Sequence, residues 1–412
     1  MASSPCKRLI GLTDKSITAD SKASTLSGML GVTTRKLFAG GRIASSPAGG
    51  TMKAAFPVSL GEVDPAWLTD VLRANRLIAQ GEKVDGFEAS PIGLGFGQTG
   101  ESARLTLRYA RSETSTKAPA SLFAKFATTD PVRRKASKAI GLYQREVNFY
   151  NVLVKAASVR APACYFAETT GEGEFFALLL EDFPNHRPGD ETVGLKVEEA
   201  RLAIDLMAQL HGPYWGKMAK VDLAPLVMPA RDRYVVAWNE MEARFGEHVP
   251  DRFREAREAY LDAIVPLQQW LTSQPSTLGH GDLRLDNLLF GRDGNDPIVA
   301  VDWQAVRPSK GMRDFAYLVS HSMNVDDRRA NELELLRRYV ERIGSFGIRY
   351  SFEDAREDYR KAMLFDFCTV LYIVGININT HERALRRKHA LMTRAVTAML
   401  DWNVLDLLPA FR

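Results

Sequence analysis

The sequence predicts an α+β protein in which a strand-rich segment precedes a mainly helical one. Two observations support this prediction. Between about residues 57 and 181, short runs alternate apolar and polar residues, which is typical of strands with one buried face. After Pro184, apolar residues recur mostly at helical spacing. The chain has 412 residues, 45% of them hydrophobic and 25% charged, which suits a globular protein of two or three folding units.

Cysteine content and hydropathy exclude several classes of protein. The three cysteines are far apart, which excludes a disulfide scaffold and a CxxC metal or redox site and favours a reducing, cytoplasmic location. The most apolar run, Met363–Ile376, is interrupted by Asp366 and is shorter than the roughly 18 residues of a membrane span. We therefore expect a buried helix there and no membrane span.

Residues 1–51 differ from the rest of the chain because they are rich in Ser, Ala, Gly and Thr. They carry seven Lys or Arg and two Asp, a net charge of +5, whereas the whole chain has +4. The remaining 361 residues therefore sum to −1, which gives no support for a nucleic-acid-binding domain. A disordered basic extension over residues 1–56 is the preferred interpretation, with Met52 as a second possible start. An organelle transit peptide and a basic arm for nucleic acid or acidic membranes are the alternatives.

The strand-rich segment begins with a predicted helix over Val63–Leu77, in which Asp64 is a suitable N-cap and Pro65 occupies the first helical position. A polar turn at Ser112–Ala120 separates the first two predicted strands. The further elements are strands at Ala103–Arg111 and Ser121–Ala127, a helix at Ala139–Val154, and strands at Ala161–Glu168 and Glu174–Leu180.

The segment after Pro184 contains five stretches with helical periodicity and one exception, Thr277–Pro308. In the exception, Leu288–Phe290 and Ile298–Val301 read as two short strands joined by a polar turn, which predicts a hairpin. The helical stretches are Lys196–His211, Tyr234–Ser273 with a break near Pro250, Asp326–Ile343, Phe352–Ile376 and Glu382–Val404.

Polar residues capable of chemistry flank this hairpin. Asn287 precedes its first strand and Asp302 follows its second, so the two should be neighbours. An amide oxygen beside a carboxylate is a hard-oxygen site suited to Mg²⁺. Asp282, five residues before Asn287, can face the same cavity and accept a proton from a substrate hydroxyl.

The pattern His280-Gly-Asp282-x4-Asn287, followed by a strand and Asp302-Trp-Gln, resembles the catalytic core of the aminoglycoside phosphotransferase and choline kinase-like superfamily. The full motif, HGDLRLDN followed by VDWQ, looks most like the bacterial phosphotransferase and ecdysteroid-kinase-like branch. The resemblance covers about residues 57–412. It implies a two-lobed protein-kinase-like fold, with a small antiparallel-sheet lobe at 57–181 that binds nucleotide and a larger helical lobe at 182–412 that carries the catalytic loop and the acceptor site.

The resemblance also implies a role for each motif residue. Asp282 is then the catalytic base, and His280 supports the catalytic loop through backbone contacts. Asn287 and Asp302 are the metal ligands. Asp314 is the residue that braces the catalytic loop, and the alternative, an N-cap for a helix that starts at Phe315, is compatible with that role.

Lys125 is the candidate cation for the nucleotide phosphates. It lies in the middle of an apolar strand, where a lysine is costly without a partner, and Glu146 on the following helix would be that partner. This pair would reproduce the strand-Lys and helix-Glu ion pair of the fold. The alternatives are that Lys125 lies on a solvated sheet face and that Glu146 pairs with Arg145.

Two further segments complete the predicted nucleotide site. The glycine-rich run that contains Gly95 and Gly97 allows close backbone approach to phosphates, although an ordinary hairpin turn is the alternative. Glu181, Asp182 and Phe183 resemble the hinge between the lobes, whose backbone would bind adenine, with Asp182 itself in a structural role.

The acceptor site should lie among the later helices and near the segment after Asp302. Four basic residues there would suit an acidic or phosphate-bearing acceptor, with pairing to local acids as the alternative; they are Arg284, Arg307, Lys310 and Arg313. Five aromatic residues could line an apolar pocket, although each is an ordinary core residue otherwise; they are Trp215, Tyr234, Trp238, Tyr317 and Tyr372.

Together these features predict an ATP- and Mg²⁺-dependent phosphotransferase that moves the γ-phosphate to a hydroxyl of a small molecule. A nucleotide-binding pseudokinase that acts as a scaffold is the alternative, but the intact catalytic residues argue against it. A protein kinase is disfavoured because Asp302-Trp-Gln replaces Asp-Phe-Gly and no Ala-Pro-Glu follows.

Overall fold

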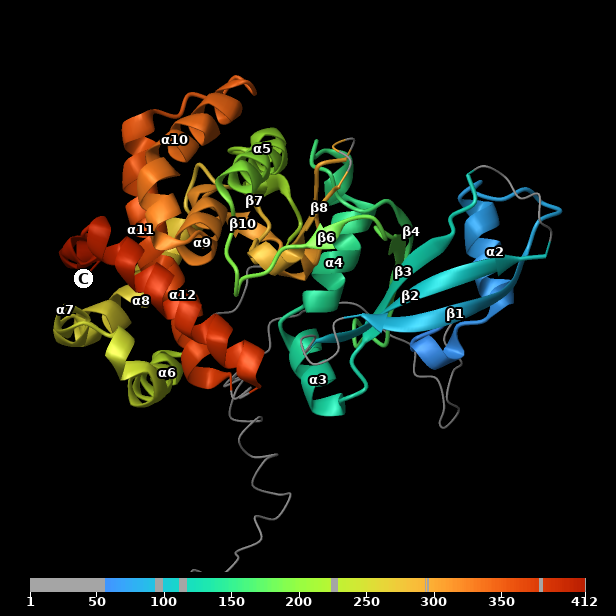
Figure 1. Cartoon of the computed structure of the whole chain (residues 1–412), viewed down its shortest axis with the longest axis horizontal. Helices are drawn as coiled ribbons and strands as arrows, with labels where there is room; N and C mark the ends of the chain where they lie inside the picture. The colour runs from blue at the N-terminus through green and yellow to red at the C-terminus, as the bar shows by residue number, and fades with distance from the viewer. Residues whose placement is uncertain are drawn as a thin grey trace, which may run out of the picture. The chain divides into compact units, whose positions relative to one another are not determined.

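The computed structural model describes residues 56–92, 99–110, 117–223, 229–292, 294, 296–377 and 381–411. All of these residues belong to one compact unit, residues 45–412. A five-stranded antiparallel sheet and a larger helical part make up this unit, so the predicted α+β, two-lobed fold is confirmed (Figure 1). Of the predicted basic extension, only Phe56 is among the described residues.

The sheet has the strand order β1-β2-β3-β5-β4, and every neighbouring pair is antiparallel. The register places Lys125 of β3 opposite Ser102 of β2 and Leu178 of β5. The strands are β1 (Val84–Ile92), β2 (Gly100–Tyr109), β3 (Ser121–Ala127), β4 (Cys164–Thr170) and β5 (Phe175–Glu181).

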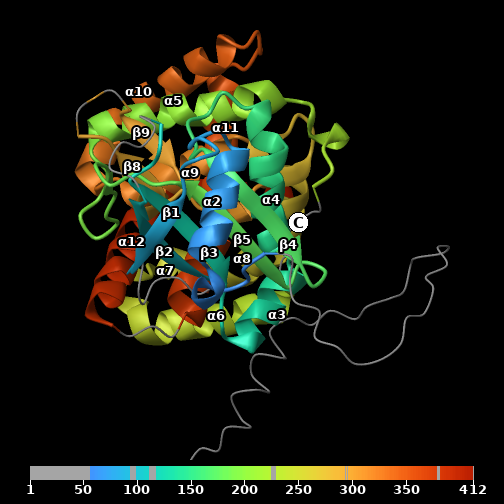
Figure 2. The same cartoon turned by 90° about the vertical axis from the view of Figure 1, so that its right-hand side faces the viewer.

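The two faces of the sheet pack into different hydrophobic cores. Ala177 and Leu179 of β5 belong to a core shared with helix α2 (Pro65–Ala74), whereas Phe176, Leu178 and Leu180 belong to the core that runs through the helical part. Figure 2 shows α2 lying across one face of the strands. Because β5 is buried on both faces, its sequence is a continuous apolar run and does not alternate between apolar and polar residues.

Helix α2 begins as predicted and ends earlier than predicted. The Asp64 carboxylate accepts the Trp67 N–H at 2.7 Å, which confirms the N-cap. The helix ends at Ala74 instead of Leu77, because Arg76 has φ of 58° and the Leu77 N–H turns back to the Leu72 carbonyl. This is the usual left-handed termination of a helix.

The sequence did not predict strand β1 or helix α3 (Pro131–Ala139). Strand β1 is an edge strand whose last five residues are exposed, so it needs no alternating pattern and tolerates Pro91. Helix α3 has only one buried residue, Ser137, and therefore lacks an apolar stripe. Its N-terminus is capped by the Asp130 carboxylate, which accepts the Val132 N–H at 2.9 Å.

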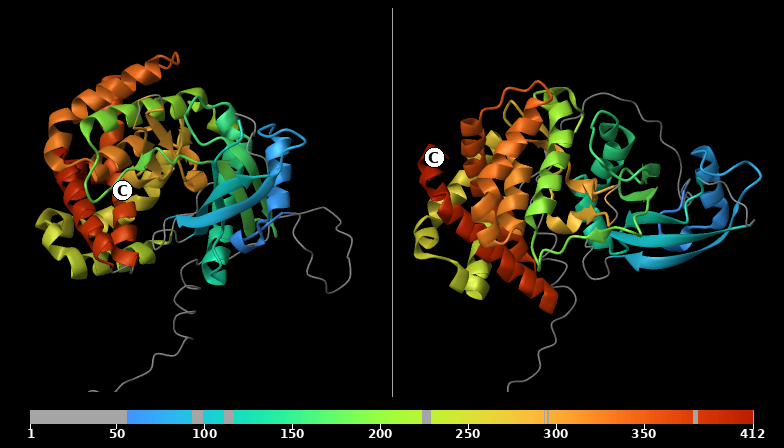
Figure 3. Two further views of the ribbon diagram at one scale, coloured as in Figure 1. Left: turned by 45° about the vertical axis from the view of Figure 1, so that its right-hand side comes forward. Right: turned by 45° about the horizontal axis from the view of Figure 1, so that its top comes forward.

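The helical part gathers beside the sheet, as the two views of Figure 3 show. The predicted break near Pro250 is confirmed, because α6 ends at Phe245 and a new helix begins at Asp251. Helix α4 (Leu142–Asn151) lies between β3 and β4 in the chain. The longer helices after the sheet are α5 (Val197–Tyr214), α6 (Arg231–Phe245), α8 (Arg257–Thr272), α9 (Met312–Ser322), α10 (Val325–Gly344), α11 (Phe352–Leu371) and α12 (Glu382–Asp401), with α7 (Asp251–Glu255) between α6 and α8.

The apolar run Met363–Ile376 is a buried helix, as predicted. It forms the end of α11 and a π-helical turn, Tyr372–Ile376. Gly375 is required in that turn, since a Cβ there would lie 2.1 Å from the Ala237 carbonyl oxygen of α6. Among the described residues, no helix combines the length and the apolar character that crossing a membrane requires.

Candidate active site

The predicted hairpin forms and brings the two ends of the motif together. β8 (Leu288–Phe290) pairs with β9 (Ile298–Ala300), with Leu288 opposite Ala300. The Val301 N–H donates to the Asn287 carbonyl at 3.0 Å, so Asn287 and Asp302 lie at the same end of the hairpin. The catalytic loop, residues 280–287, runs between β7 (Thr277–Gly279) and β8.

Strand β7 pairs with β10 (Arg307–Ser309), and this pairing was not predicted because each strand has only three residues. The catalytic loop that follows β7 needs a glycine at position 281. Gly281 has φ of 83°, and a Cβ there would lie 2.1 Å from the Ala305 carbonyl oxygen. The catalytic loop therefore packs directly against the backbone that follows Asp302.

Asp314 holds the start of the catalytic loop. Its carboxylate accepts the backbone N–H of His280 at 2.6 Å and that of Gly281 at 3.1 Å. The alternative N-cap role was wrong, because α9 begins at Met312 and not at Phe315, so Asp314 lies inside the first turn. From there its side chain turns to the loop instead of capping its own helix.

Burial of Asp314 would raise its pKa, but its partners reverse that effect. His211 Nε2 donates to the carboxylate at 3.2 Å, and the positive charge of Arg313 lies close by, so the pKa of Asp314 falls below its usual range. The Tyr339 hydroxyl lies 2.8 Å from the other ring nitrogen of His211, which orients the imidazole. Asp314 is therefore an ionised carboxylate in a fully buried position.

His280 is a positioning residue and is 0% exposed. Burial lowers the pKa of His280, so the imidazole is neutral near pH 7. Its Nε2–H donates to the Val301 carbonyl at 3.1 Å, and its Nδ1 accepts the Asp282 N–H at 3.3 Å. The ring thereby links the catalytic loop to the strand that precedes Asp302.

Asp282 presents a partly accessible carboxylate at the end of this loop, with 31% of its side chain exposed. The Tyr317 hydroxyl donates to Oδ1 at 3.1 Å, and Asn287 Nδ2 donates to Oδ2 at 3.3 Å. Arg284 Nε lies 3.6 Å from Oδ2. These contacts orient the carboxylate and leave part of it open to a ligand.

Tyr317 was predicted only as a possible pocket residue and not as a partner of Asp282. The signal was its spacing, since Tyr317 lies three residues after Asp314 on α9 and so shares the helix face that meets the loop. Of the other aromatic candidates, Tyr234 and Trp238 are core residues, Trp215 is partly buried against the core, and Tyr372 is exposed.

Asp302 adopts a left-handed conformation, with φ of 64° and ψ of 62°, which is uncommon for a residue other than glycine. Its Oδ1 accepts from Lys125 Nζ at 2.7 Å and its Oδ2 from Gln304 Nε2 at 3.2 Å. Asn287 Nδ2 also donates to the Asp282 carbonyl at 2.8 Å, which leaves the Asn287 amide oxygen as the atom available for a cation. This set of oxygen donors fits Mg²⁺.

Lys125 joins the sheet to this site. Its Nζ lies 3.0 and 2.8 Å from the two carboxylate oxygens of Glu146 on α4, so the predicted pair forms, and it also contacts Asp302. Arg145, the alternative partner, donates to the Val306 carbonyl at 3.0 Å. Lys125 is 8% exposed, which excludes a solvated sheet face.

Lys125, Glu146 and Asp302 shift one another's pKa values. Burial would lower the pKa of Lys125, but the carboxylates of Asp302 and Glu146 raise it above its usual value, so the ammonium is charged. Burial raises the pKa of Glu146 to about 7 in spite of the Lys125 charge. Burial would also raise the pKa of Asp302, but the positive charge of Lys125 outweighs it, so the pKa of Asp302 is lowered.

Gly95 and Gly97 of the predicted glycine loop lie outside the described residues. The residues that follow them are anchored to the site. Thr99 Oγ1 donates to Gln304 Oε1 at 3.0 Å, and Gly100 lets β2 approach β3, because a Cβ there would lie 2.8 Å from the Phe126 carbonyl oxygen. The end of the glycine loop is therefore adjacent to the segment that carries Asp302.

The predicted hinge residues begin with Glu181, the last residue of strand β5. The Glu181 carboxylate binds Arg160 through two bonds of 2.9 Å. The Asp182 carboxylate accepts from Arg104 at 2.6 Å, from Ser121 at 2.5 Å and from the Phe183 N–H at 2.9 Å. The side chain of Asp182 therefore has a structural role, as predicted, and an adenine that used the Phe183 N–H would have to displace this contact.

Three of the four basic residues considered for the acceptor side are turned into the protein, which contradicts the acceptor role for them. Of these three, Arg313 follows the alternative that was left open, pairing with local acids. Arg307 Nη2 donates to the Gly281 carbonyl at 3.0 Å, and Lys310 Nζ donates to the Pro275 carbonyl at 3.0 Å. Arg313 binds Asp366 at 2.9 Å, and both side chains are buried. These cations compensate buried oxygens, and Arg284 alone of the four contacts Asp282.

His321, at the end of α9, provides a pH-dependent contribution to stability. Burial, reinforced by the charge of Arg313, lowers its pKa to about 3, and its Nδ1 makes no hydrogen bond within the described residues. Since the folded pKa lies below the unfolded value of about 6.5, this contribution is complete above pH 7 and is lost as the pH falls.

We expect His321→Asn to flatten this part of the stability profile. Wild-type stability should fall by about 1.4 kcal/mol per pH unit from this group alone below about pH 6.5. Urea unfolding of both proteins at pH 7.5, 6.0 and 5.0 measures the difference. Parallel profiles for the two proteins would contradict the assignment.

A family model described as the phosphotransferase enzyme family (APH) matches residues 106–349 of this chain. No curated protein sequence matches the chain. A structure of a microcompartment-associated aminopropanol kinase has a TM-score of 0.50 and 14% identity, and the match covers 84% of this chain and 99% of that chain.

Two further structures have lower scores. A choline kinase from Cryptosporidium parvum has a TM-score of 0.48 and 13% identity, with 83% of this chain and 98% of that chain covered. A spectinomycin phosphotransferase in complex with ADP and spectinomycin has a TM-score of 0.45 and 14% identity, with 83% of this chain and 99% of that chain covered.

Proposed function

The chain belongs to the phosphotransferase enzyme family, and on that premise we propose that it transfers the γ-phosphate of ATP to a hydroxyl group of a small molecule. One observation carries the proposal. Lys125 Nζ contacts Glu146 and Asp302 together, so the sheet and the hairpin meet at one point beside the catalytic loop. Phosphoryl transfer needs positioning and charge neutralisation above all, and this arrangement supplies both.

In the proposed reaction Asp282 accepts the proton of the acceptor hydroxyl. Its carboxylate is partly exposed, whereas Tyr317 and Asn287 hold its two oxygens in a fixed orientation. A general base must lie within hydrogen-bond reach of the proton that it removes, and such an oriented carboxylate at the end of a braced loop meets that requirement.

Lys125 would bind the phosphates of ATP. In the structure its ammonium is held by two carboxylates, those of Glu146 and Asp302. We expect Lys125 to keep Glu146 as its partner and to exchange Asp302 for a phosphate oxygen when ATP binds. Asn287 and Asp302 would then hold Mg²⁺, which neutralises phosphate charge in this class of reaction.

Lys125→Met should lower kcat/KM for ATP by about 10²-fold or more, because the phosphates lose their buried cation. Initial rates at varied ATP concentration test this expectation. Lys135→Met is the matched control, since Lys135 is exposed on α3 and should leave the kinetics unchanged. Equal kcat/KM in wild type and Lys125→Met would contradict the assigned role.

The reaction itself is tested with an extract of small metabolites, labelled ATP and Mg²⁺, followed by identification of the labelled product. The proposal predicts a phosphate monoester of a small alcohol that forms with wild type and not with Asp282→Asn. Label in protein would favour a protein kinase instead. Stabilisation by Mg-ATP without any product would favour a nucleotide-binding scaffold.

A further inference from the structure

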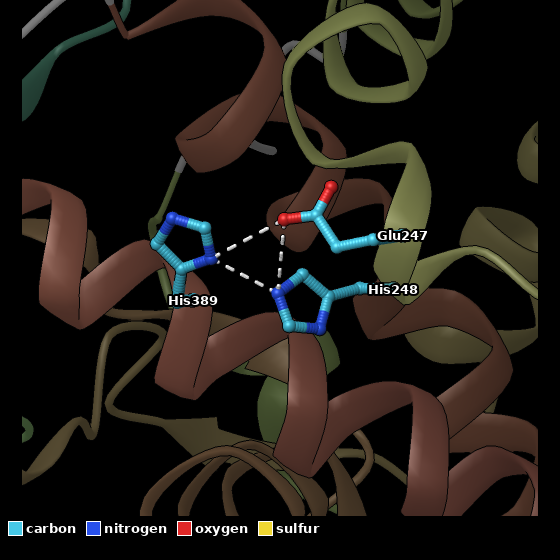
Figure 4. A group of neighbouring side chains, drawn as sticks. All are labelled: Glu247, His248 and His389. Atoms are coloured by element: carbon cyan, nitrogen blue, oxygen red, sulfur yellow. Dashed lines mark hydrogen bonds and ion pairs between the residues drawn. The ribbon is translucent and has the colours of Figure 1, made fainter.

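Three side chains outside the predicted active site place ligand atoms of the kind that bind transition metals around one point (Figure 4). Glu247 and His248 belong to the short helix η5 (Gly246–His248) that follows α6, and His389 belongs to α12. Their three ligand atoms all lie within 4.8 Å of one another, and no other group of this kind occurs in the part of the chain that the structure describes.

The distances between these atoms match the edges of a metal coordination sphere. His248 Nε2 lies 2.9 Å from His389 Nδ1, and Glu247 Oε1 lies 3.6 Å from the former and 3.7 Å from the latter. In a tetrahedral zinc site with bonds of 2.0–2.1 Å, neighbouring ligand atoms are about 3.3 Å apart. The observed triangle is therefore close to one face of such a tetrahedron.

A hydrogen bond between the two imidazoles explains only part of this geometry. It accounts for the contact of 2.9 Å, but Glu247 Oε1 is nearly equidistant from both nitrogens and beyond hydrogen-bond length from each. A carboxylate placed in this way completes a set of two imidazoles and one carboxylate, which suits Zn²⁺.

The surroundings of His248 orient the ring for this role. Its Nδ1 lies 3.4 Å from the hydroxyl of Thr393, one turn after His389 on α12. When Nδ1–H donates to Thr393 Oγ1, Nε2 is the unprotonated nitrogen and keeps its lone pair for a metal ion, as metal-binding histidines require. The ring of His389 packs edge-on against Phe245, with ring centres 4.8 Å apart.

We propose that Glu247, His248 and His389 form a zinc-binding site that ties the α6–α7 connection to α12. Glu247 and His389 are exposed and His248 is half-buried, so a fourth position is open to water.

The consequence for the fold is a link between helices far apart in the sequence. Helix α12 also carries Arg387 and Arg394, which bind Glu191, and the Glu191 N–H donates to Asp286 of the catalytic loop at 3.3 Å.

The test uses the full-length, untagged protein, stripped of metal by a chelator and kept in excess Mg²⁺. Calorimetric titration with ZnCl₂ should show one site, and zinc should raise the melting temperature. His248→Ala and His389→Ala should each weaken zinc binding at least tenfold. His381→Asn is the matched control, because His381 caps the first turn of α12, Asn is also a good N-cap, and the variant should bind zinc as wild type does.

A readout independent of affinity excludes misfolding as the cause. Co²⁺ in place of Zn²⁺ should give the visible absorption of a four-coordinate site in wild type and in His381→Asn, and not in His389→Ala with an unchanged circular dichroism spectrum. Absence of a stoichiometric zinc site, or equal zinc affinity of wild type and His389→Ala, would overturn the proposal.

Discussion

Asp282→Asn should lower kcat by about 10²- to 10⁴-fold and leave the affinity for Mg-ATP nearly unchanged. The carboxylate is the only part of the side chain that can take the hydroxyl proton, and the amide that replaces it cannot. The isosteric amide fits the same space, so the fold should be retained. Steady-state kinetics with the acceptor that the metabolite-labelling experiment identifies, together with ATP-induced thermal shifts, measures the two effects separately.

Asp327→Asn is the matched control for this experiment. Asp327 is exposed in the first turn of α10, far along the chain from the catalytic loop, and the same substitution there should leave kcat unchanged. A wild-type rate in Asp282→Asn would show that the carboxylate is not the base. Loss of both ATP binding and turnover would indicate a structural role instead.

Asp314→Ala should give the largest loss of stability, about 3–5 kcal/mol, together with loss of activity. The substitution leaves two buried backbone N–H groups of the catalytic loop and the His211 ring without their acceptor. It also leaves Arg313 with one fewer buried counter-charge. Each orphaned donor carries a desolvation cost.

Two measurements distinguish this effect from a general loss of charge. Asp205→Asn removes a carboxylate that binds Arg338 and Arg342 near the surface, and should cost at most about 1 kcal/mol. Because the pKa of Asp314 lies below its usual range, its contribution is complete above about pH 4 and is lost only in stronger acid. The difference between wild type and Asp314→Ala in urea unfolding should therefore be constant from pH 8 to pH 5, and a difference that shrinks within that range would contradict the assignment.

Most helices and the inner strands could be predicted because their residues repeat with the period of the element. Strand β3 was predicted with its observed bounds, and the break near Pro250 was found at the proline. Strand β1 and helix α3 were missed, since neither buries an apolar face that would set such a period. The pairing of β7 with β10 joins three-residue strands, too short for any pattern.

The partner of a charged residue was harder to predict than its presence. Lys125 and Glu146 were paired correctly, because a lysine in an apolar strand needs a counter-charge. Arg307 and Lys310 were predicted either to suit an acidic acceptor or to pair with local acids, whereas each donates to a main-chain carbonyl group. A sequence does not show which main-chain carbonyl groups will be buried. The cations that donate to them are therefore easily mistaken for surface charges.

The sequence by itself determined the order of the lobes, the hairpin and the identity of the motif residues, because periodicity and spacing are local properties. The role of Asp314 in bracing the catalytic loop was also predicted, from the resemblance, and its contacts confirm it. Only the tertiary structure decided that Tyr317 orients Asp282 and that Lys125 bridges two carboxylates. The same holds for the cluster of Glu247, His248 and His389, in which the two histidines are 141 residues apart in the sequence. Such contacts depend on how packed helices and strands align in space, and the spacing of residues along a chain does not contain that alignment.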